Sequence, residues 1–223
     1  MSSLFKEAIY YLDFKDVNRV DNLQKLLSEE ELKKANRFLK NRDKESYIIS
    51  HAFLRILLTH YSPHIEPKDW IFEKNQYGKP FLAKKHQIKL YFNLSHTYSH
   101  VAIILSTLGE CGIDIEEDRG LILDNNLIDL VLTKKEREIY YLDKKRETFY
   151  IFWTLKEAYL KAEGLGFTIP PNEVDFSFFD REKSLVKDGY LYGTKLISEN
   201  IYLSYVFQLN LFKFNLNKNV TVP

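Results

Sequence analysis

The chain has 223 residues, enough for one large domain or two small ones. Hydrophobic residues make up 45% and aromatic residues 15% of it, with only 8 glycines and 6 prolines, which excludes a disordered or collagen-like chain. Because 32 basic residues nearly balance 31 acidic ones, no overall charge attracts the chain to nucleic acid or to an anionic membrane. We therefore expect a globular protein with neither of these partners, in which any anion site is local.

Cysteine content and the start of the chain bear on its compartment. Cys111 is the single cysteine, so no disulfide can form within the chain. Residues 1–16 carry charges where a signal peptide needs an apolar run, and the longest uncharged stretch, residues 90–109, is too polar for a membrane helix. These features predict a cytoplasmic protein.

The first half of the chain is predicted to open with a strand over residues 7–14. Ser28 and Glu31 have the spacing of a capping box, which should begin a helix that runs to about Leu39. A second helix is expected from about Asp43 to Tyr61, with one face formed by Ile49, Phe53, Ile56, Leu57 and His60. Short strands are then expected over residues 70–74, 90–93 and 101–105, with a turn over residues 75–80.

The second half repeats this order of elements. A strand is predicted over residues 111–117, a capping box at Thr133 and Glu136, and a long helix from about Lys145 to Glu163 that ends at Gly164. Further strands are expected over residues 174–179, 184–187, 190–197 and 201–209.

The repeated order predicts an α+β fold built as a pseudo-twofold duplication. Each half would be a small, mostly antiparallel sheet packed with a long helix. A shift of about 104 residues pairs residues 9–13 with residues 113–117, and the seam falls near Leu108 to Cys111. We therefore divide the chain into halves over residues 1–108 and 109–223, with a candidate ligand cleft between them. The alternative is that two capping boxes coincide by chance.

Asp114 and Glu116 lie two apart on a predicted strand, so their carboxylates share one face, while Ile113 and Ile115 share the other. Two neighbouring carboxylates repel each other unless a cation separates them, and oxygen ligands suit Mg²⁺. The alternative is that they form the solvated face of an edge strand.

On the predicted long helix, Trp153, Glu157 and Lys161 are spaced four apart, with Lys156 beside them. A plain surface ion pair between Glu157 and Lys161 is the alternative there.

Two further segments could bind phosphate. Ser95 and His96 end a predicted strand with side chains that can donate hydrogen bonds, and Lys79 in the 77–80 turn is a point charge. The single cysteine and the lack of a His-Glu-x-x-His sequence argue against zinc. No glycine-rich nucleotide motif is present, which argues against Rossmann and P-loop folds.

In this order, the four segments resemble the signature motifs of the phosphopantetheinyl transferases of the surfactin-synthetase-activating type. They are Tyr77-Gly-Lys-Pro80, Phe92-Asn-Leu-Ser-His96, Gly112-Ile-Asp-Ile-Glu116 and Trp153-x-x-Lys-Glu-x-x-x-Lys161. The resemblance implies transfer of the 4′-phosphopantetheine arm of coenzyme A to a serine of an apo acyl or peptidyl carrier protein, with release of 3′,5′-ADP. It covers nearly the whole chain, and the duplicated layout implies a functional monomer.

Site roles follow from the same resemblance. Asp114, Glu116 and Glu157 would hold Mg²⁺, and Glu157, or a water that it holds, would take the proton of the carrier serine. Lys161 would neutralise or protonate the leaving phosphate, with Lys156 beside it. The contacts to coenzyme A would come from Lys34, Arg42, Tyr77, Gly78, Lys79, Pro80, Ser95, His96, Lys156 and Lys161, and the turn over residues 77–80 would line the adenine pocket.

The chain also departs from the family pattern. Glu31 and Ser46 stand where relatives place basic residues, so contacts to the 3′-phosphate of coenzyme A rest on Lys34 and Arg42. Two other functions compete with transfer: a non-catalytic binder of coenzyme A or carrier protein, and a Mg²⁺-dependent nucleotide hydrolase.

Overall fold

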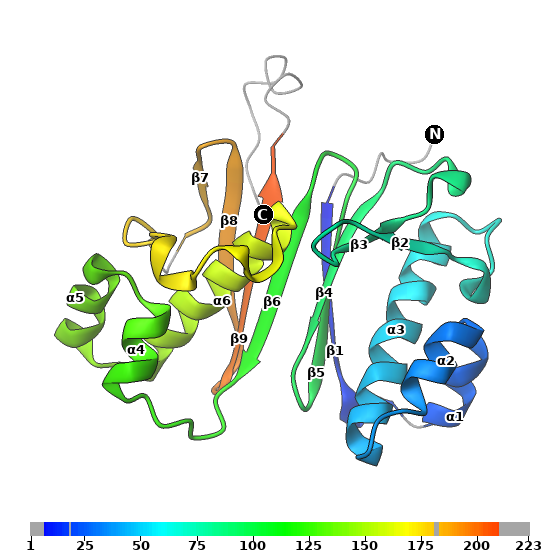
Figure 1. Ribbon diagram of the computed structural model, residues 1–223, viewed down its shortest axis with the longest axis horizontal. Coiled ribbons are helices and arrows are strands. Elements are labelled where there is room, and N and C mark those ends of the chain that lie inside the picture. Colours follow the sequence, from blue (N-terminus) through cyan, green and yellow to red (C-terminus); the bar gives the residue numbers. More distant parts are fainter. Residues whose placement is uncertain (1–6, 18, 181–182, 210–223) are drawn as a thin grey trace.

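The computed structural model describes residues 7–17, 19–180 and 183–209. Strands lie at the centre of the molecule, with α1–α3 on one flank and α4–α6 on the other (Figure 1). The predicted α+β class with antiparallel sheets is confirmed. Among the described residues, no helix is long and apolar enough to cross a membrane.

The first half contains a three-stranded antiparallel sheet in the order β1-β5-β4. Its strands are β1 (Glu7–Asp13), β4 (Tyr91–His96) and β5 (His100–Ser106). Helices α1 (Val20–Leu23), α2 (Glu29–Ala35) and α3 (Asn41–Tyr61) cover its outer face, and a small hairpin joins β2 (Phe72–Lys74) to β3 (Pro80–Leu82).

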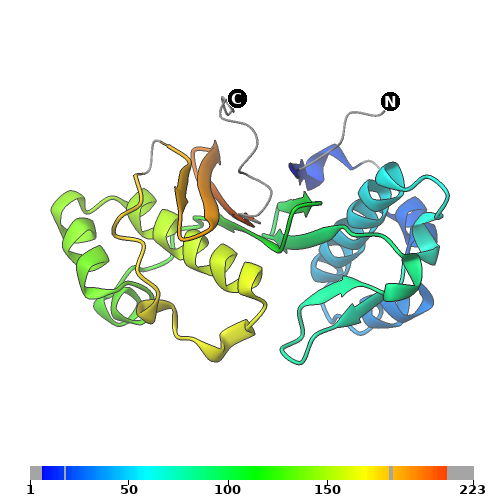
Figure 2. The same cartoon turned by 90° about the horizontal axis from the view of Figure 1, so that it is seen from above.

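The second half contains a four-stranded antiparallel sheet in the order β6-β9-β8-β7. Its strands are β6 (Cys111–Glu117), β7 (Leu185–Lys187), β8 (Tyr190–Ser198) and β9 (Ile201–Gln208). Helices α4 (Asn125–Val131), α5 (Lys134–Asp143) and α6 (Arg146–Glu163) lie on its outer side (Figure 2).

The two halves share one connectivity. In the first half, the first strand β1 pairs with the last strand β5, which also pairs with β4. In the second half, the first strand β6 pairs with the last strand β9, which also pairs with β8. Both predicted capping boxes are present, and α3 and α6 are the long helices that follow them. This arrangement is the one that a duplication would produce.

An apolar cluster joins the two sheets. It combines Ala102 and Ile104 of β5 with Ile113 and Ile115 of β6 and with Leu203 of β9, all of them buried. Burial of these side chains removes apolar surface of both sheets from water, so the halves form one body. The alternation predicted for β6 is confirmed, since both isoleucines point into this cluster.

Some expected details are wrong. Helix α2 ends at Ala35 and not near Leu39, β3 was not expected, and residues 174–179 form no strand. Along α3, Ile56 and His60 are exposed although they were assigned to one face with buried Ile49 and Leu57.

Candidate active site

Helix α6 lies unusually close to β6 because of one glycine. A Cβ atom added to Gly112 would lie 1.9 Å from the carbonyl oxygen of Ala158, a distance that no side chain permits. Asp114 and Glu116 point to the same side of the strand as Gly112, since side chains alternate along it. The close approach therefore brings these two carboxylates under the helix that carries Glu157 and Lys161.

Three side chains from three elements meet in hydrogen-bond contact. The Lys161 ammonium lies 2.6 Å from Oδ1 of Asp114, and the Ser95 hydroxyl donates to the same oxygen at 2.8 Å. Lys161 also donates to the Ser95 oxygen at 3.0 Å. Asp114 is only 2% exposed, so this ion pair is shielded from solvent on one side. Side chains of β4, β6 and α6 thus converge on one point in the structure.

The site carries more negative charge than Lys161 can neutralise. Burial, together with Asp114 and Glu157, raises the pKa of Glu116 to about 7, against the opposing effect of Lys161. Burial and the charge of Asp114 also raise the pKa of Glu157. Both carboxyls are therefore hard to ionise together while the site contains no further cation.

The donor set suits a hard divalent cation. Oδ2 of Asp114 is buried and has no hydrogen-bond partner among the described residues, so one carboxylate oxygen remains available. Carboxylates are ligands that Mg²⁺ prefers. However, no group of three or more His, Cys, Asp or Glu side chains in the described part of the chain is already arranged to hold a metal ion. The chemistry of the residues fits Mg²⁺, and the ligand set stays a proposal.

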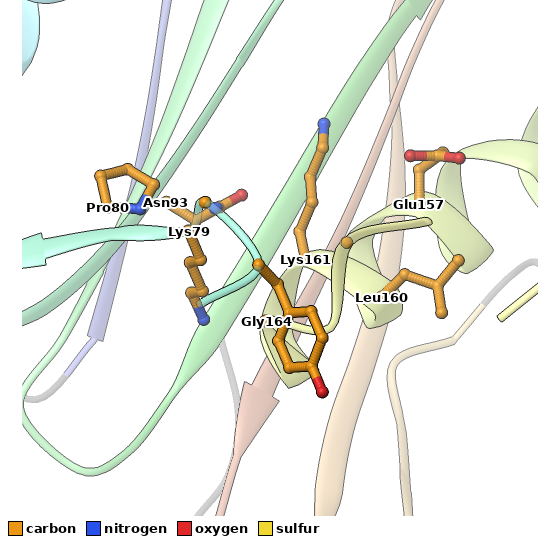
Figure 3. Close-up of a pocket in the computed structure, with 10 residues that line it drawn as sticks. Lys79, Pro80, Asn93, Glu157, Leu160, Lys161 and Gly164 are labelled. Atoms are coloured by element: carbon orange, nitrogen blue, oxygen red, sulfur yellow. The ribbon is translucent and has the colours of Figure 1, made fainter. Parts of the chain in front are cut away.

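A pocket of about 260 Å³ opens on one side of this cluster (Figure 3). The turn over residues 77–80 forms one wall, and Glu157, Leu160 and Lys161 of α6 form the other. The turn is held against the end of α6 because the Asn75 amide donates to the carbonyl of Gly164 at 2.8 Å. Gly164 has a φ of +67°, which ends the helix there as predicted.

A larger groove of about 530 Å³ opens on the other side of the cluster. Glu116 forms part of its wall, together with residues of α2, α3, the β4–β5 connection and the segment after β6. They include Lys34, Phe38, Tyr47, His51, His96, Tyr98 and Arg119. We call Asp114, Glu116, Glu157 and Lys161 the acidic cluster. Because Glu157 and Lys161 line the pocket and Glu116 lines the groove, this cluster lies between the two spaces.

Two predicted contacts to coenzyme A do not fit the structure. Lys156 was expected beside Lys161, but its ammonium lies 2.5 Å from Glu136 and is fully buried on another side of α6. Lys79 does line the pocket, but its ammonium points away from Lys161 (Figure 3), where it pairs with Glu110 at 2.5 Å and donates to Ala162 O at 2.8 Å. Both ammonium groups are already neutralised by protein partners.

The remaining predicted contacts are divided between several places. Tyr77, Gly78 and Pro80 line the pocket, while Lys34 and His96 line the groove. Partial burial, His51 and Lys161 lower the pKa of His96, which favours its neutral form. Arg42 lies outside both spaces, where its guanidinium stacks on Tyr98 and donates to the carbonyl of that residue at 3.1 Å.

Sequence reasoning missed two supporting residues. Asn93 sits within the quoted Phe92 to His96 motif, and its side-chain oxygen accepts a 3.1 Å hydrogen bond from the backbone of Ile113, which ties β4 to β6. His51 lines the groove and contacts the Glu31 carboxylate at 3.1 Å. The sequence around His51 does not indicate this contact, because it joins α3 to a glutamate of another helix, α2.

Comparison with known proteins identifies both halves. Residues 110–209 match the family model described as 4′-phosphopantetheinyl transferase superfamily, and residues 17–107 match the model described as 4′-phosphopantetheinyl transferase, N-terminal.

Several curated proteins are similar to the chain. A putative 4′-phosphopantetheinyl transferase, slr0495, of Synechocystis sp. is 32% identical over 163 residues, which are 70% of this chain and 64% of that protein. The 4′-phosphopantetheinyl transferase HetI of Nostoc sp. is 31% identical over 153 residues, 67% of this chain and 64% of the relative. The 4′-phosphopantetheinyl transferase Sfp of Bacillus subtilis is 26% identical over 153 residues, which are 67% of this chain and 66% of that protein. The chain thus spans just under two thirds of the length of these relatives.

The two family models together cover the second sheet, strands β4 and β5 of the first sheet and both long helices, and the curated relatives have the same description. The chain belongs to the 4′-phosphopantetheinyl transferase superfamily.

Proposed function

We propose that the protein is a Mg²⁺-dependent 4′-phosphopantetheinyl transferase that modifies a serine of an apo acyl or peptidyl carrier protein. The observation that carries the proposal is the cluster of Asp114, Glu116, Glu157 and Lys161 between a small pocket and a larger groove. A protein that only bound coenzyme A would gain nothing from three carboxylates that repel one another. The relatives' names support the same activity.

Coenzyme A would bind with its nucleotide end against the turn formed by Tyr77, Gly78 and Pro80. Its pyrophosphate would lie at the cluster, where Lys161 and the Ser95 hydroxyl can donate hydrogen bonds to it. Lys34 and His96 would contact phosphate from the groove side. The structure gives no support for contacts from Lys79 and Lys156, so these are not part of the proposal.

Asp114 and Glu116, with Glu157 as a third carboxylate, would hold Mg²⁺. When bound, Mg²⁺ supplies positive charge that neutralises the pyrophosphate oxygens. It would also relieve the repulsion that raises the pKa of Glu116 and Glu157.

The carrier serine oxygen would form a bond to the β-phosphorus as the bond from that phosphorus to the leaving 3′,5′-ADP breaks. The serine proton would pass to Glu157 through a water molecule that Glu157 orients. Burial, the largest cause of the raised pKa of Glu157, is still present when Mg²⁺ has relieved the repulsion, and it favours proton uptake by this carboxylate. Lys161 would meet the charge that develops on the leaving phosphate, because its ammonium is already held at the cluster.

One assay tests this function. The protein is incubated with coenzyme A, Mg²⁺ and a panel of apo carrier domains, and each carrier is then weighed by mass spectrometry. We expect a carrier to gain the mass of one phosphopantetheine arm, and a carrier with alanine in place of its serine to gain none. Chelation of Mg²⁺ should stop the reaction, and added Mg²⁺ should restore it.

The alternatives give different products in the same assay. A binder would retain coenzyme A and leave every carrier unchanged in mass. A nucleotide hydrolase would split coenzyme A in the absence of any carrier. Either result would overturn the proposal.

A further inference from the structure

Asp118 follows β6 directly and is not used by the proposed chemistry. Its backbone N–H donates to the carbonyl of Asn200 at 2.8 Å, which extends the pairing between β6 and β9 by one residue. Because side chains alternate along a strand, Asp118 lies on the same face as Asp114 and Glu116, the face that α6 covers. A third carboxylate therefore stands at the end of the row, and it has partners of its own.

Arg146 of α6 binds the Asp118 carboxylate through two hydrogen bonds. Its Nε donates to Oδ2 and its Nη2 to Oδ1, each at 2.5 Å. The hydroxyl of Tyr150, one turn further along α6, donates to Oδ1 at 3.3 Å. The hydrogen bonds from Arg146 are the largest cause of the lowered pKa of Asp118. Two bonds between a guanidinium and a carboxylate fix orientation as well as distance.

The position of Arg146 within its helix is unfavourable without this partner. Arg146 is the first residue of α6, and the N-terminus of a helix carries a partial positive charge that repels a cation. The residue before it, Lys145, makes no side-chain capping bond and is also basic. The carboxylate of Asp118 neutralises Arg146 and brings negative charge to this helix end. The pair thus ties the end of β6 to the start of α6.

Helix α6 and strand β6 lie side by side in opposite directions, with a fixed contact near each end (Figure 1). One contact is the close approach of Gly112 to Ala158, and the other is the pair of Asp118 and Arg146. The three carboxylates of the acidic cluster belong to the stretches between these contacts. The spacing of strand and helix at the cluster is therefore held from both sides.

This spacing matters for a small cation. Mg²⁺ requires nearly ideal octahedral geometry and short bonds to oxygen, so its affinity falls when ligands from two elements are displaced relative to each other. Carboxylates that face each other without a cation also repel, which favours separation of β6 from α6. A contact that resists this separation keeps the ligands ready for the ion.

We propose that Asp118 and Arg146 are positioning residues, which hold Glu116 of β6 and Glu157 of α6 close enough to bind the same Mg²⁺. The inference rests on the proposed function, because it concerns the cation of that reaction. Neither residue would touch coenzyme A, the carrier or the metal ion. Their effect would pass through the backbone of β6 and α6.

The test measures the Mg²⁺ requirement of Arg146→Gln in two ways. One is the Mg²⁺ concentration that gives half of the maximal transfer rate. The other is the concentration that gives half of the rise in melting temperature caused by Mg²⁺ in the presence of coenzyme A and without a carrier, which requires no reaction. We expect both concentrations to increase about tenfold, with turnover at saturating Mg²⁺ within about twofold of the wild type.

The direction of this change separates positioning from simple electrostatics. Removal of a cation near the carboxylates would, by Coulomb attraction alone, strengthen Mg²⁺ binding and lower both concentrations. Asp118→Asn should raise them as Arg146→Gln does, and the double variant should raise them no further, because either change breaks the same contact. Arg146→Lys keeps the charge but cannot form the two bonds, and it should give an intermediate increase.

Another aspartate–arginine pair of the second half provides the matched control. Asp129 of α4 pairs with Arg137 of α5 at 3.0 Å and does not join β6 to α6. Asp129→Asn should leave the Mg²⁺ requirement at its wild-type value. Each variant is also melted without Mg²⁺, and Arg146→Lys, the mildest change, carries the test if Arg146→Gln does not fold.

Several outcomes would overturn the proposal. They are an unchanged or lowered Mg²⁺ requirement in Arg146→Gln, additive effects in the double variant, and an equal shift in Asp129→Asn. A lower melting temperature without Mg²⁺ and an unchanged Mg²⁺ requirement would make the pair purely structural.

These outcomes differ from failure of the proposed function. If the wild type transfers no phosphopantetheine to any carrier, the function is wrong, and the melting experiment still shows whether the pair controls Mg²⁺ binding. If Mg²⁺ changes neither the transfer rate nor the melting temperature of the wild type, the metal site and this inference are both wrong. If the wild type is active and depends on Mg²⁺ as its variants do, only the positioning role is wrong.

Discussion

Each half of the molecule has a capping box whose glutamate turns inward and meets a cation on the following long helix. In the first half, Arg55 of α3 donates to Glu31 at 2.8 Å, and in the second half Lys156 of α6 lies 2.5 Å from Glu136. Arg55 and Lys156 are almost completely buried. The two halves thus use the same internal ion pair to fix a short helix against a long one.

The first strands of the two halves differ sharply. At the shift of 104 residues, Tyr10 and Leu12 of β1 correspond to Asp114 and Glu116 of β6. Tyr10 and Leu12 pack against the apolar core of the first half, whereas the two carboxylates form the acidic cluster. The comparison indicates that the ion pairs common to both halves are structural, and that the groups proposed for chemistry lie where the second half departs from the first.

The largest expected effect tests the ion pair of the second half. Lys156→Ala would leave the Glu136 carboxylate buried without its cation, which should lower the free energy of unfolding by about 3 to 5 kcal/mol. Denaturant unfolding measures this loss. The fraction that remains folded should keep the wild-type KM for coenzyme A, because Lys156 points away from the pocket. A variant with normal stability and a raised KM would contradict this assignment.

Next in size is the effect of Asp114→Asn, which keeps the shape of the side chain and removes its charge. We expect the turnover number to fall about a thousandfold, which corresponds to a barrier about 4 kcal/mol higher. The reason is that Asp114 is both a proposed Mg²⁺ ligand and the ion-pair partner of Lys161, and an amide is weaker in both roles. The melting temperature without Mg²⁺ should change little, since repulsion among the carboxylates decreases as the ion pair is lost. Added Mg²⁺ should raise the melting temperature of the wild type more than that of the variant.

Lys161→Ala separates a catalytic lysine from a surface ion pair. A surface pair is worth about 0.3 to 0.5 kcal/mol and would leave turnover unchanged. Loss of a group that meets charge on the leaving phosphate should cost about 3 kcal/mol, or about a hundredfold in the turnover number, with little change in the KM for coenzyme A. Glu157→Gln should have a similar effect. Retention of more than about a third of wild-type turnover by Lys161→Ala would place Lys161 outside the chemistry.

The smallest effect concerns the ion pair of the first half and its dependence on pH. Although burial opposes it, hydrogen bonds from His51 and Arg55 lower the pKa of Glu31 to about 2. The folded-state pKa lies below that of the unfolded chain, so the stabilisation is present above pH 4.5 and is lost as the pH falls toward 2. It amounts to roughly 2 to 3 kcal/mol.

Unfolding of the wild type and of Glu31→Gln between pH 6 and pH 3 measures this contribution. The stability difference between them should shrink as the pH decreases. A difference that stays constant over this range would mean that Glu31 gains nothing from its charge. Transfer activity at neutral pH should be similar in both proteins, because Glu31 faces Arg55 and His51 and lines neither the pocket nor the groove.

Local features of the fold could be predicted from the sequence because their causes are local. Capping boxes, a terminating glycine and alternation along β6 depend on residues a few positions apart, and all of them are present. The grouping of Asp114 with Glu116 follows from the same alternation. Their meeting with Lys161 was expected from the resemblance, and Gly112 supplies its physical cause by allowing α6 to approach β6.

Other features were decided only by tertiary contacts. Residues 174–179 have the composition of a strand, but no neighbouring strand pairs with them, and Phe176 is instead buried with its backbone N–H donating to Glu136. Lys156 and Lys161 carry the same charge on one helix, yet one is enclosed by core contacts and the other opens on the candidate site. The amino-acid sequence determined which groups each helix carries. Packing against distant segments determined which of those groups remain free to act, because burial and pairing depend on neighbours far away in the chain.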